Sequence, residues 1–169
     1  MNYHFKLLMT AGVLAASLGI QTVQAAKTSM TIALQLEPPH LDPTSAAAGA
    51  IDSVLYSNVF EGLTRFASDG AVIPGLAKSW EISDDGTEYT FQLNSGVTFH
   101  DGSTMDANDV KFSLDRARSE ESTNAQKALF SGINNIEVLT NDKVKVTLAS
   151  PNGSFLFNMA WGDAVIVAP

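Results

Sequence analysis

The 169-residue sequence contains no cysteine. Disulfides, zinc–thiolate centres and thiol nucleophiles are therefore excluded, and so is a lipid anchor on an N-terminal cysteine. Basic residues are also few: 10 lysines and arginines stand against 18 aspartates and glutamates, and the formal net charge is −8. Because nucleic acids and anionic membranes attract basic surfaces, we expect neither as a partner.

Histidine is scarce as well, with three in the chain. His4 lies in an N-terminal segment that we expect to be removed, which leaves His40 and His100. No H-x-x-x-H pair occurs, and the aspartates that follow His100 do not have the spacing of an EF-hand loop. We therefore expect no metal site, and no motif predicts a cofactor.

The first 25 residues have the pattern of a secretory signal peptide. Lys6 supplies the positive charge, residues 7–20 form an apolar core, and Val23-Gln24-Ala25 has small side chains where signal peptidase requires them. A membrane-spanning helix would need about 20 apolar residues, and this core is shorter. We expect export through the Sec pathway, with cleavage after Ala25 or Ala26.

Polar and apolar residues alternate in several short stretches, as is typical of strands. Residues 30–36 predict a first strand, which the prolines between 37 and 43 must end because proline donates no ladder hydrogen bond. A further short strand is expected at 97–99. Turns rich in Asp, Asn and Gly predict three hairpins: 63–66 with 71–73, 80–82 with 89–93, and 136–138 with 144–148.

Apolar residues at helical spacing predict a helix over about 46–61 and a second over 107–118, with Asp106 as the N-cap of the second. A short helix is expected near 155–159. The apolar run 164–168 is typical of a buried strand. Helices combined with antiparallel hairpins indicate an α+β or mixed α/β fold.

The run Thr98–Ser103, TFHDGS, contains the residue types of a hydrolase triad. In such a triad the histidine lies between nucleophile and carboxylate, whereas adjacent residues of an extended chain point to opposite sides. No G-x-S-x-G elbow presents a serine either. We therefore interpret Asp101 and Gly102 as a turn after a strand, leading to the helix cap, and we predict no catalytic residue.

The segment 37–43, EPPHLDP, follows the first predicted strand. Ligands of open α/β sheets often bind beyond strand ends, and prolines would hold this backbone rigid. Glu37, Pro39 and His40 are therefore the candidate ligand-binding residues. The alternative is an ordinary rigid strand exit.

Several stretches together resemble bacterial family 5 solute-binding proteins, the periplasmic receptors of peptide, dipeptide and nickel ABC importers. The likeness extends over the mature chain, with the motifs in family order. The stretches that carry it are Glu37–Pro43, Asn58–Leu63, PGLAKSWE from Pro74, SDDGTEYTFQL from Ser83, GVTFHDG from Gly96 and TMDANDVKFS from Thr104.

The resemblance implies the N-terminal part of a two-lobed, type II periplasmic-binding-protein fold with an extra small domain. Residues 26–44 would be the first strand and exit loop of lobe I, 45–160 the small domain, and 161–169 a strand returning to lobe I. Family members are much longer, so lobe II would be absent and the chain would be a fragment cut at Pro169.

The resemblance also implies a function and partners. The whole protein would be a non-enzymatic, monomeric periplasmic receptor that delivers a small peptide to an ABC permease in the inner membrane. Nickel chelates, haem, opine-like compounds and sugars stay as alternative ligands. A secreted hydrolase using His100 and a non-transporting interaction domain are the rival functions.

Overall fold

The computed structural model describes residues 29–45 and 49–169 of the protein. Two units are distinguished, Met1–Ala33 and Leu34–Pro169, and the helices and strands found among the described residues all lie in the second. Residues 29–33 of the first unit are exposed and form neither helix nor strand. The predicted signal peptide, with both of its cleavage positions, lies outside the described residues.

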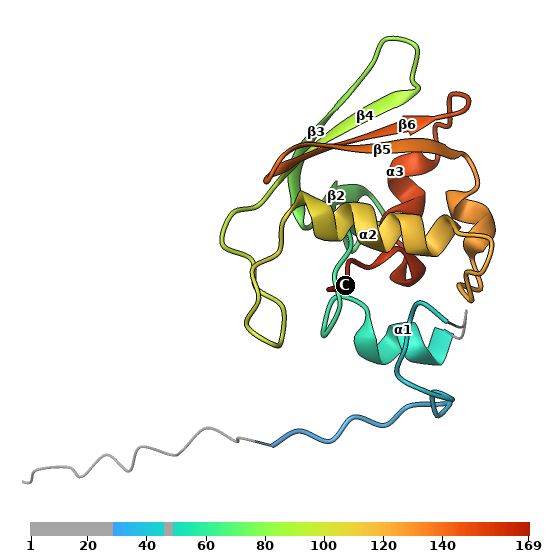
Figure 1. The fold of residues 1–169 in the computed structure, drawn as a ribbon. Helices are drawn as coiled ribbons and strands as arrows, with labels where there is room; N and C mark the ends of the chain where they lie inside the picture. The colour runs from blue at the N-terminus through green and yellow to red at the C-terminus, as the bar shows by residue number, and fades with distance from the viewer. Residues whose placement is uncertain (1–28, 46–48) are drawn as a thin grey trace, which may run out of the picture. The chain divides into compact units, whose positions relative to one another are not determined.

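A four-stranded antiparallel sheet organises the second unit (Figure 1). Its spatial order is β3-β4-β6-β5, so the hairpin β3–β4 is joined to the hairpin β5–β6 along the β4–β6 edge. Side chains of β4 and β6 alternate between buried and partly exposed. The strands are β3 (Ala77–Ile82), β4 (Glu88–Leu93), β5 (Ile133–Thr140) and β6 (Lys143–Leu148).

The turn between β3 and β4 shows why the hairpin forms where it was predicted. Gly86 has φ +70°, a conformation in which a Cβ would be strained. One Asp85 carboxylate oxygen accepts hydrogen bonds from the Ser83 hydroxyl at 2.6 Å and from the Thr87 amide at 3.0 Å. These bonds hold the pKa of Asp85 below its ordinary value of 3.8. The short polar side chains and the glycine therefore set the register of the longer hairpin.

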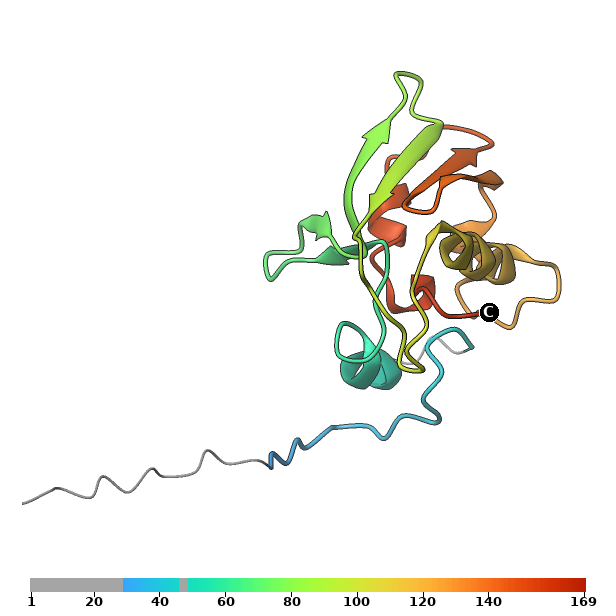
Figure 2. The ribbon, with the colours of Figure 1, turned by 60° about the vertical axis from the view of Figure 1, so that its left-hand side comes forward.

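Helix α2 (Ala107–Arg118) lies across one face of the sheet, as Figures 1 and 2 both show. Asp106 caps it by accepting from the amide of Asn108 at 2.7 Å, and the Asp109 carboxylate accepts from the amide of Asp106. This reciprocal capping box fixes the start of the helix. The core beneath it consists of buried apolar side chains. The most fully buried large ones from α2 and the sheet are Val110, Leu114, Phe91, Leu93, Val144 and Val146, and Phe130 and Phe155 from later segments join them.

A small hairpin, β1 (Thr64–Phe66) with β2 (Val72–Pro74), and helix α1 (Gly49–Leu55) complete the first half of the unit. Gly62 and Gly75, which flank the hairpin, permit close backbone packing at its base. A Cβ on Gly75 would lie 2.6 Å from the carbonyl oxygen of Gly62, and one on Gly62 would lie 2.8 Å from that of Met159. Leu76 donates to the Gly62 carbonyl at 3.0 Å.

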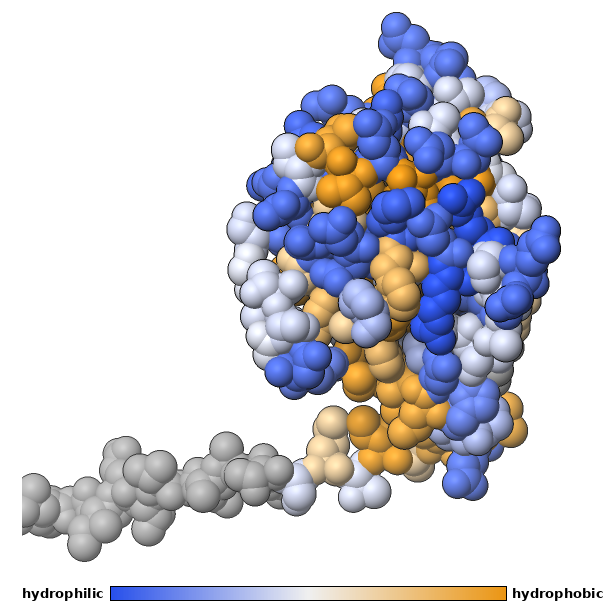
Figure 3. All heavy atoms as spheres, in the orientation of Figure 1, coloured by the Kyte–Doolittle hydropathy of each residue, from blue (hydrophilic) through white to orange (hydrophobic). Residues whose placement is uncertain are grey.

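The C-terminal segment contains helix α3 (Phe155–Asn158) and the 3₁₀ turn η2 (Gly162–Ala164). Another 3₁₀ turn, η1 (Lys127–Phe130), precedes β5. Tyr89 and Phe155 pack with ring centroids 4.6 Å apart, which joins α3 to the sheet. Polar residues cover most of the face seen in Figure 3. One group of apolar residues lies over the four-stranded sheet and another over α1 and the segment before it, where Leu34, Leu36 and Leu41 are exposed.

Four of the predicted elements are wrong in whole or in part. Residues 30–36 form no strand, because no described strand pairs with them and a ladder needs a partner. Helix α1 ends at Leu55 instead of near Gly62, because Ser57 takes a positive φ of 57° that breaks the helix. Residues 46–48 of that prediction lie outside the described residues.

The other two corrections concern short strands. Residues 97–99 make an isolated bridge between Thr98 and Thr104, which is a turn-closing contact within one loop. The predicted return strand within 161–169 is a 3₁₀ turn followed by one bridge from Val165 to Gly62. Val165 and Ile166 are nevertheless buried, as the apolar run predicted. The domain boundaries at 44 and 160 stay predictions.

Candidate functional site

The segment that carries the candidate ligand-binding residues is exposed up to its last turn. Glu37, Pro39 and His40 are all exposed, and none of them lines a cavity found among the described residues. The turn that follows is held by Asp42, whose carboxylate accepts from the Thr44 amide at 2.8 Å and hydroxyl at 2.7 Å. Thr44 is the one residue of this segment that reaches a cavity.

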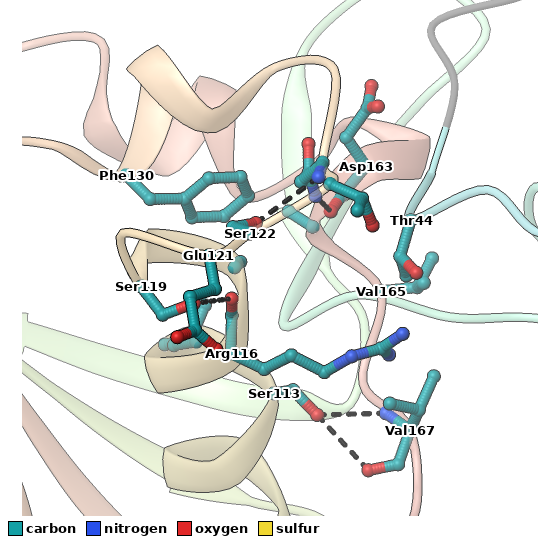
Figure 4. Close-up of a pocket in the computed structure, with 15 residues that line it drawn as sticks. Thr44, Ser113, Arg116, Ser119, Glu121, Ser122, Phe130, Asp163, Val165 and Val167 are labelled. Carbon is teal, nitrogen blue, oxygen red and sulfur yellow. Dashed lines mark hydrogen bonds between the residues drawn. The ribbon is translucent and has the colours of Figure 1, made fainter.

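That cavity, of about 220 Å³, lies where four parts of the chain meet (Figure 4). Thr44 borders it on one side, and the C-terminal half of α2 borders it on another. The loop 119–124 and the segment 163–167 close the remainder, with Phe130 at the inner wall. The lining is mixed, with hydroxyl, amide and charged groups beside apolar ones, as is usual for sites that bind small polar molecules.

Arg116 is the cation of this cavity. It is exposed, and its side chain extends from α2 toward Thr44 and Val167 in Figure 4. Among the described residues, no carboxylate forms an ion pair with it within 4.0 Å. Burial alone would raise the pKa of Asp42, but hydrogen bonds from Thr44 and Ser45 and the charge of Arg116 lower it below its ordinary value. The guanidinium therefore keeps its donors available to a bound anion.

Ser113 joins the far side of the cavity to α2. Its hydroxyl accepts from the amide of Val167 at 2.9 Å and donates to the carbonyl of Val167 at 3.1 Å. Ile166, the preceding residue, donates to the carbonyl of Glu61 at 2.9 Å. The segment 165–167 is thus held on both sides without belonging to a strand.

Asp163 is the most deeply buried charged group of the site, with 3% of its surface exposed. Its Oδ1 has no hydrogen-bond partner. Burial, together with the nearby negative charge of Asp52, raises the pKa of Asp163 to about 6. In Figure 4 the Asp163 carboxylate points away from Arg116, so it does not neutralise that cation. Asn124, also buried, donates to the Asp163 carbonyl at 2.9 Å.

A second cavity, of about 600 Å³, contains the residues of the hydrolase hypothesis. His100 and Asp101 line it together with apolar side chains such as Phe99 and Ile166. The Asp101 carboxylate accepts from the amide of Ser103 at 2.9 Å and from its hydroxyl at 2.6 Å, and His100 has no part in these bonds. Gly102 has φ +88°. The run is a side-chain-stabilised turn, as interpreted from the sequence.

Within 29–45 and 49–169, no three His, Cys, Asp or Glu side chains gather closely enough to hold a metal ion. In the same residues no helix has the length and apolar character needed to cross a bilayer.

Comparison with known proteins identifies the chain's relatives. Residues 71–167, more than half of the chain, match the model of the bacterial extracellular solute-binding proteins, family 5 (middle region). The chain belongs to this family. Its members are periplasmic solute receptors, and the resemblance found in the sequence is confirmed, as are the mixed α+β class and the periplasmic-binding-protein fold.

The curated relatives of this chain include proteins whose names refer to peptide binding. It is 36% identical over 169 residues to the glutathione-binding protein GsiB of Pectobacterium atrosepticum. This match covers 100% of the present chain and 32% of GsiB. The chain is 32% identical over 167 residues to di/tripeptide-binding protein 1 of Pseudomonas aeruginosa, covering 88% of this chain and 31% of that one. The chain thus spans about a third of the length of these relatives.

A solved structure has the same fold. The PBP AgaA from A. tumefaciens R10, in complex with agropinic acid, matches with a TM-score of 0.73 and 34% identity. The match covers 78% of this chain and 26% of that one.

Sequence reasoning missed the residues that line the first cavity. Arg116, Asn124 and Asp163 come from a helix end, a loop and a 3₁₀ turn that are far apart in the sequence. One signal was available: Asp163 interrupts an otherwise apolar C-terminal run, and a buried acid is rarely free of a role.

Proposed function

We propose that the chain is part of a periplasmic substrate-binding protein that captures small peptides and passes them to an ABC permease. The 220 Å³ cavity is proposed as this chain's share of the ligand site. The observation that carries the proposal is the exposed guanidinium of Arg116, which extends along a cavity rich in hydroxyl and amide groups and has no ion-pair partner among the described residues.

A peptide carries a terminal carboxylate and a chain of amide groups. Arg116 is suited to the carboxylate, because a guanidinium offers a planar fork of donors. Thr44, Ser122 and Thr123 offer hydroxyls at the same cavity for peptide groups. The names of the relatives, which refer to glutathione and to di- and tripeptides, support the same class of ligand.

Glu37, Pro39 and His40 are proposed as further ligand contacts. They precede the Thr44 turn by four to seven residues and are exposed, so their polar groups are available to a ligand. A Glu37 carboxylate could pair with the ammonium end of a peptide. An agropinic-acid-like solute is the second candidate ligand, because the AgaA match is as similar in sequence as the peptide receptors are.

The remaining parts of the proposal concern the whole protein. It would be exported through the Sec pathway, cleaved after Ala25 or Ala26, and act as a monomer without catalytic activity. The engagement of Asp101 by Ser103 supports the last point, because it leaves His100 without an orienting carboxylate. N-terminal sequencing of the secreted protein tests the cleavage position.

Uptake by the source bacterium tests the function. Deletion of the gene should abolish import of labelled dipeptides, tripeptides or glutathione, and the gene supplied in trans should restore it. The gene with Arg116→Ala should restore at most a tenth of the import rate at low peptide concentration, since a lost charged partner costs about 1.5–3 kcal/mol of binding. Lys111→Ala is the matched control, because Lys111 lies on the same helix, pairs with Asp115 and does not line the cavity.

A further inference from the structure

The contact between α1 and the turn 162–164 brings the Asp52 carboxylate against the turn that carries Asp163. Asp52 lies in the first turn of α1, and a Cβ on Gly162 would overlap the Asp52 carboxylate, so Asp52 packs directly over that glycine. The next residue is Asp163, which is 3% exposed and has an oxygen without a hydrogen-bond partner. A buried carboxylate with an unsatisfied oxygen costs free energy unless a proton or a cation compensates it.

The charged groups around Asp163 supply no such cation. From α1 the facing group is Asp52, which is negative when ionised. From α2 the nearest lining cation is Arg116, and the Asp163 side chain points away from it (Figure 4). The loop 119–124 contributes neutral Asn124 and exposed Glu121. No ion pair of the described residues includes Asp52 or Asp163.

A proton is therefore the species that fits this contact. Two carboxyl groups are too few to hold a metal ion, and the described residues bring no third ligand to them. A protonated Asp163 is neutral, so its burial costs less and it is no longer repelled by the Asp52 charge. Burial raises the pKa of both groups, with that of Asp163 raised to about 6, and this agrees with the geometry.

The contact is linked to the cavity by one buried side chain. Asn124 donates to the carbonyl of Asp163 at 2.9 Å, and its own oxygen accepts from the amide of Gln126 at 2.9 Å. The amide of Asn124 donates to the Ser122 hydroxyl at 3.2 Å. A movement of the turn 162–164 would therefore be transmitted to the loop 119–124, which lines the cavity.

We propose that Asp52 and Asp163 form a proton-operated latch between α1 and the turn 162–164. With Asp163 protonated the latch is closed, and Asn124 holds the cavity loop in the geometry described above. With both carboxyls ionised the latch repels, and the loop loosens. This inference does not rest on the proposed function, and it needs no ligand.

NMR titration of the 169-residue chain between pH 4 and pH 8 tests the latch directly. The Asp163 carboxyl carbon should titrate with a midpoint near pH 6, and the side-chain amide of Asn124 should shift with the same midpoint. A midpoint at or below about 4, the ordinary value for an aspartate, would overturn the proposal. So would an Asn124 amide that does not respond while Asp163 titrates.

The pH dependence of stability in variants of the chain tests the latch a second time. Because the folded-state pKa of Asp163 lies above its ordinary value of 3.8, the folded chain binds the extra proton, and this contribution to stability grows as the pH falls from about 7 to about 4. Asp163→Asn, which imitates the protonated acid, should be more stable than the parent at pH 8 and should lose this pH dependence. Asp84→Asn, at an exposed turn, is the control and should keep it.

If Asp163→Asn does not fold, Asp52→Asn replaces it. Removal of the Asp52 charge should lower the titration midpoint of Asp163, because one of the two causes of its raised value is gone. An unchanged midpoint in Asp52→Asn, or unchanged pH dependence in a folded Asp163→Asn, contradicts the latch.

Discussion

The hydroxyl of Ser113 bonds to both backbone groups of Val167, accepting from its amide at 2.9 Å and donating to its carbonyl at 3.1 Å. A strand neighbour would satisfy the same two groups in a sheet. Here one side chain on α2 does so, and Ser113 is itself 6% exposed. The C-terminal segment is therefore ordered by α2, although it joins no sheet.

Ser113→Ala should lower the free energy of unfolding by about 1–3 kcal/mol, because both backbone groups of Val167 lose their partner. Urea unfolding followed by circular dichroism measures the loss. Ser53→Ala is the control, since Ser53 is exposed and its hydroxyl bonds within its own helix, to Gly49. Equal effects of the two substitutions would contradict the bridging role of Ser113.

Phe155 and Phe157 lie two residues apart on α3 but have opposite surroundings. Phe155 is 1% exposed and packs on Tyr89 and Phe91, whereas Phe157 is 44% exposed. Phe155→Ala should cost about 3–5 kcal/mol of unfolding free energy through lost burial and a cavity. Phe157→Ala should cost about 1 kcal/mol, since this exposed ring loses mainly its contacts with the rings of Phe66 and Trp161. Thermal or urea unfolding distinguishes the two, and a reversed order would refute this assignment of the core.

The capping box of α2 predicts a smaller effect. Asp106→Ala should destabilise the chain by about 1 kcal/mol, because the amide of Asn108 loses its acceptor. Asp106→Ser should recover most of that loss, since a serine hydroxyl accepts in the same position. If Asp106→Ser is as unstable as Asp106→Ala, the cap is not the cause.

Asp115 predicts a pH dependence on the acid side. Burial alone would raise its pKa, but hydrogen bonds from Lys111 and Arg118 and their charges lower it below 3.8. A lowered folded-state pKa stabilises the fold above the ordinary value, and that contribution is lost as the pH falls below about 4. Asp115→Asn should therefore lower the free energy of unfolding by roughly 0.5–1 kcal/mol at pH 7. It should also weaken the fall of stability with pH below about 4, which is called the acid limb here.

Unfolding free energies of Asp115→Asn between pH 2.5 and pH 7 check this expectation. Glu120→Gln serves as the control, since Glu120 is exposed and its carboxylate forms no ion pair within the described residues. An acid limb in Asp115→Asn as steep as that of the control would contradict the predicted role.

The hairpins and α2 could be predicted because their signals are local. Gly86 and the acids before it define a turn, and Asp106 defines a helix start, without help from distant residues. The strand expected at 30–36 failed for the opposite reason, since alternation cannot supply a pairing partner. The helix expected to reach Glu61 failed at Ser57, whose positive φ no periodicity predicts.

The site was harder to predict because its parts come from four separated segments. The sequence singled out Glu37, Pro39 and His40, which are exposed, and missed Arg116, which lines the cavity. Helix periodicity places Arg116 on a polar face, but tertiary packing decides what that face meets. Family resemblance identified the type of protein without locating this cavity.

The central claim is that the chain belongs to a receptor that supplies peptides to an importer. The most direct measurement is the initial rate of uptake of labelled dipeptide, tripeptide and glutathione by the source bacterium with and without the gene. Peptide concentrations of about 1 μM make uptake depend on binding of about −8 kcal/mol or stronger. Uptake of at least one of these peptides should fall to background on deletion and return with the intact gene. Unchanged uptake of all three, with uptake of agropinic acid, a nickel chelate or haem lost instead, would contradict it.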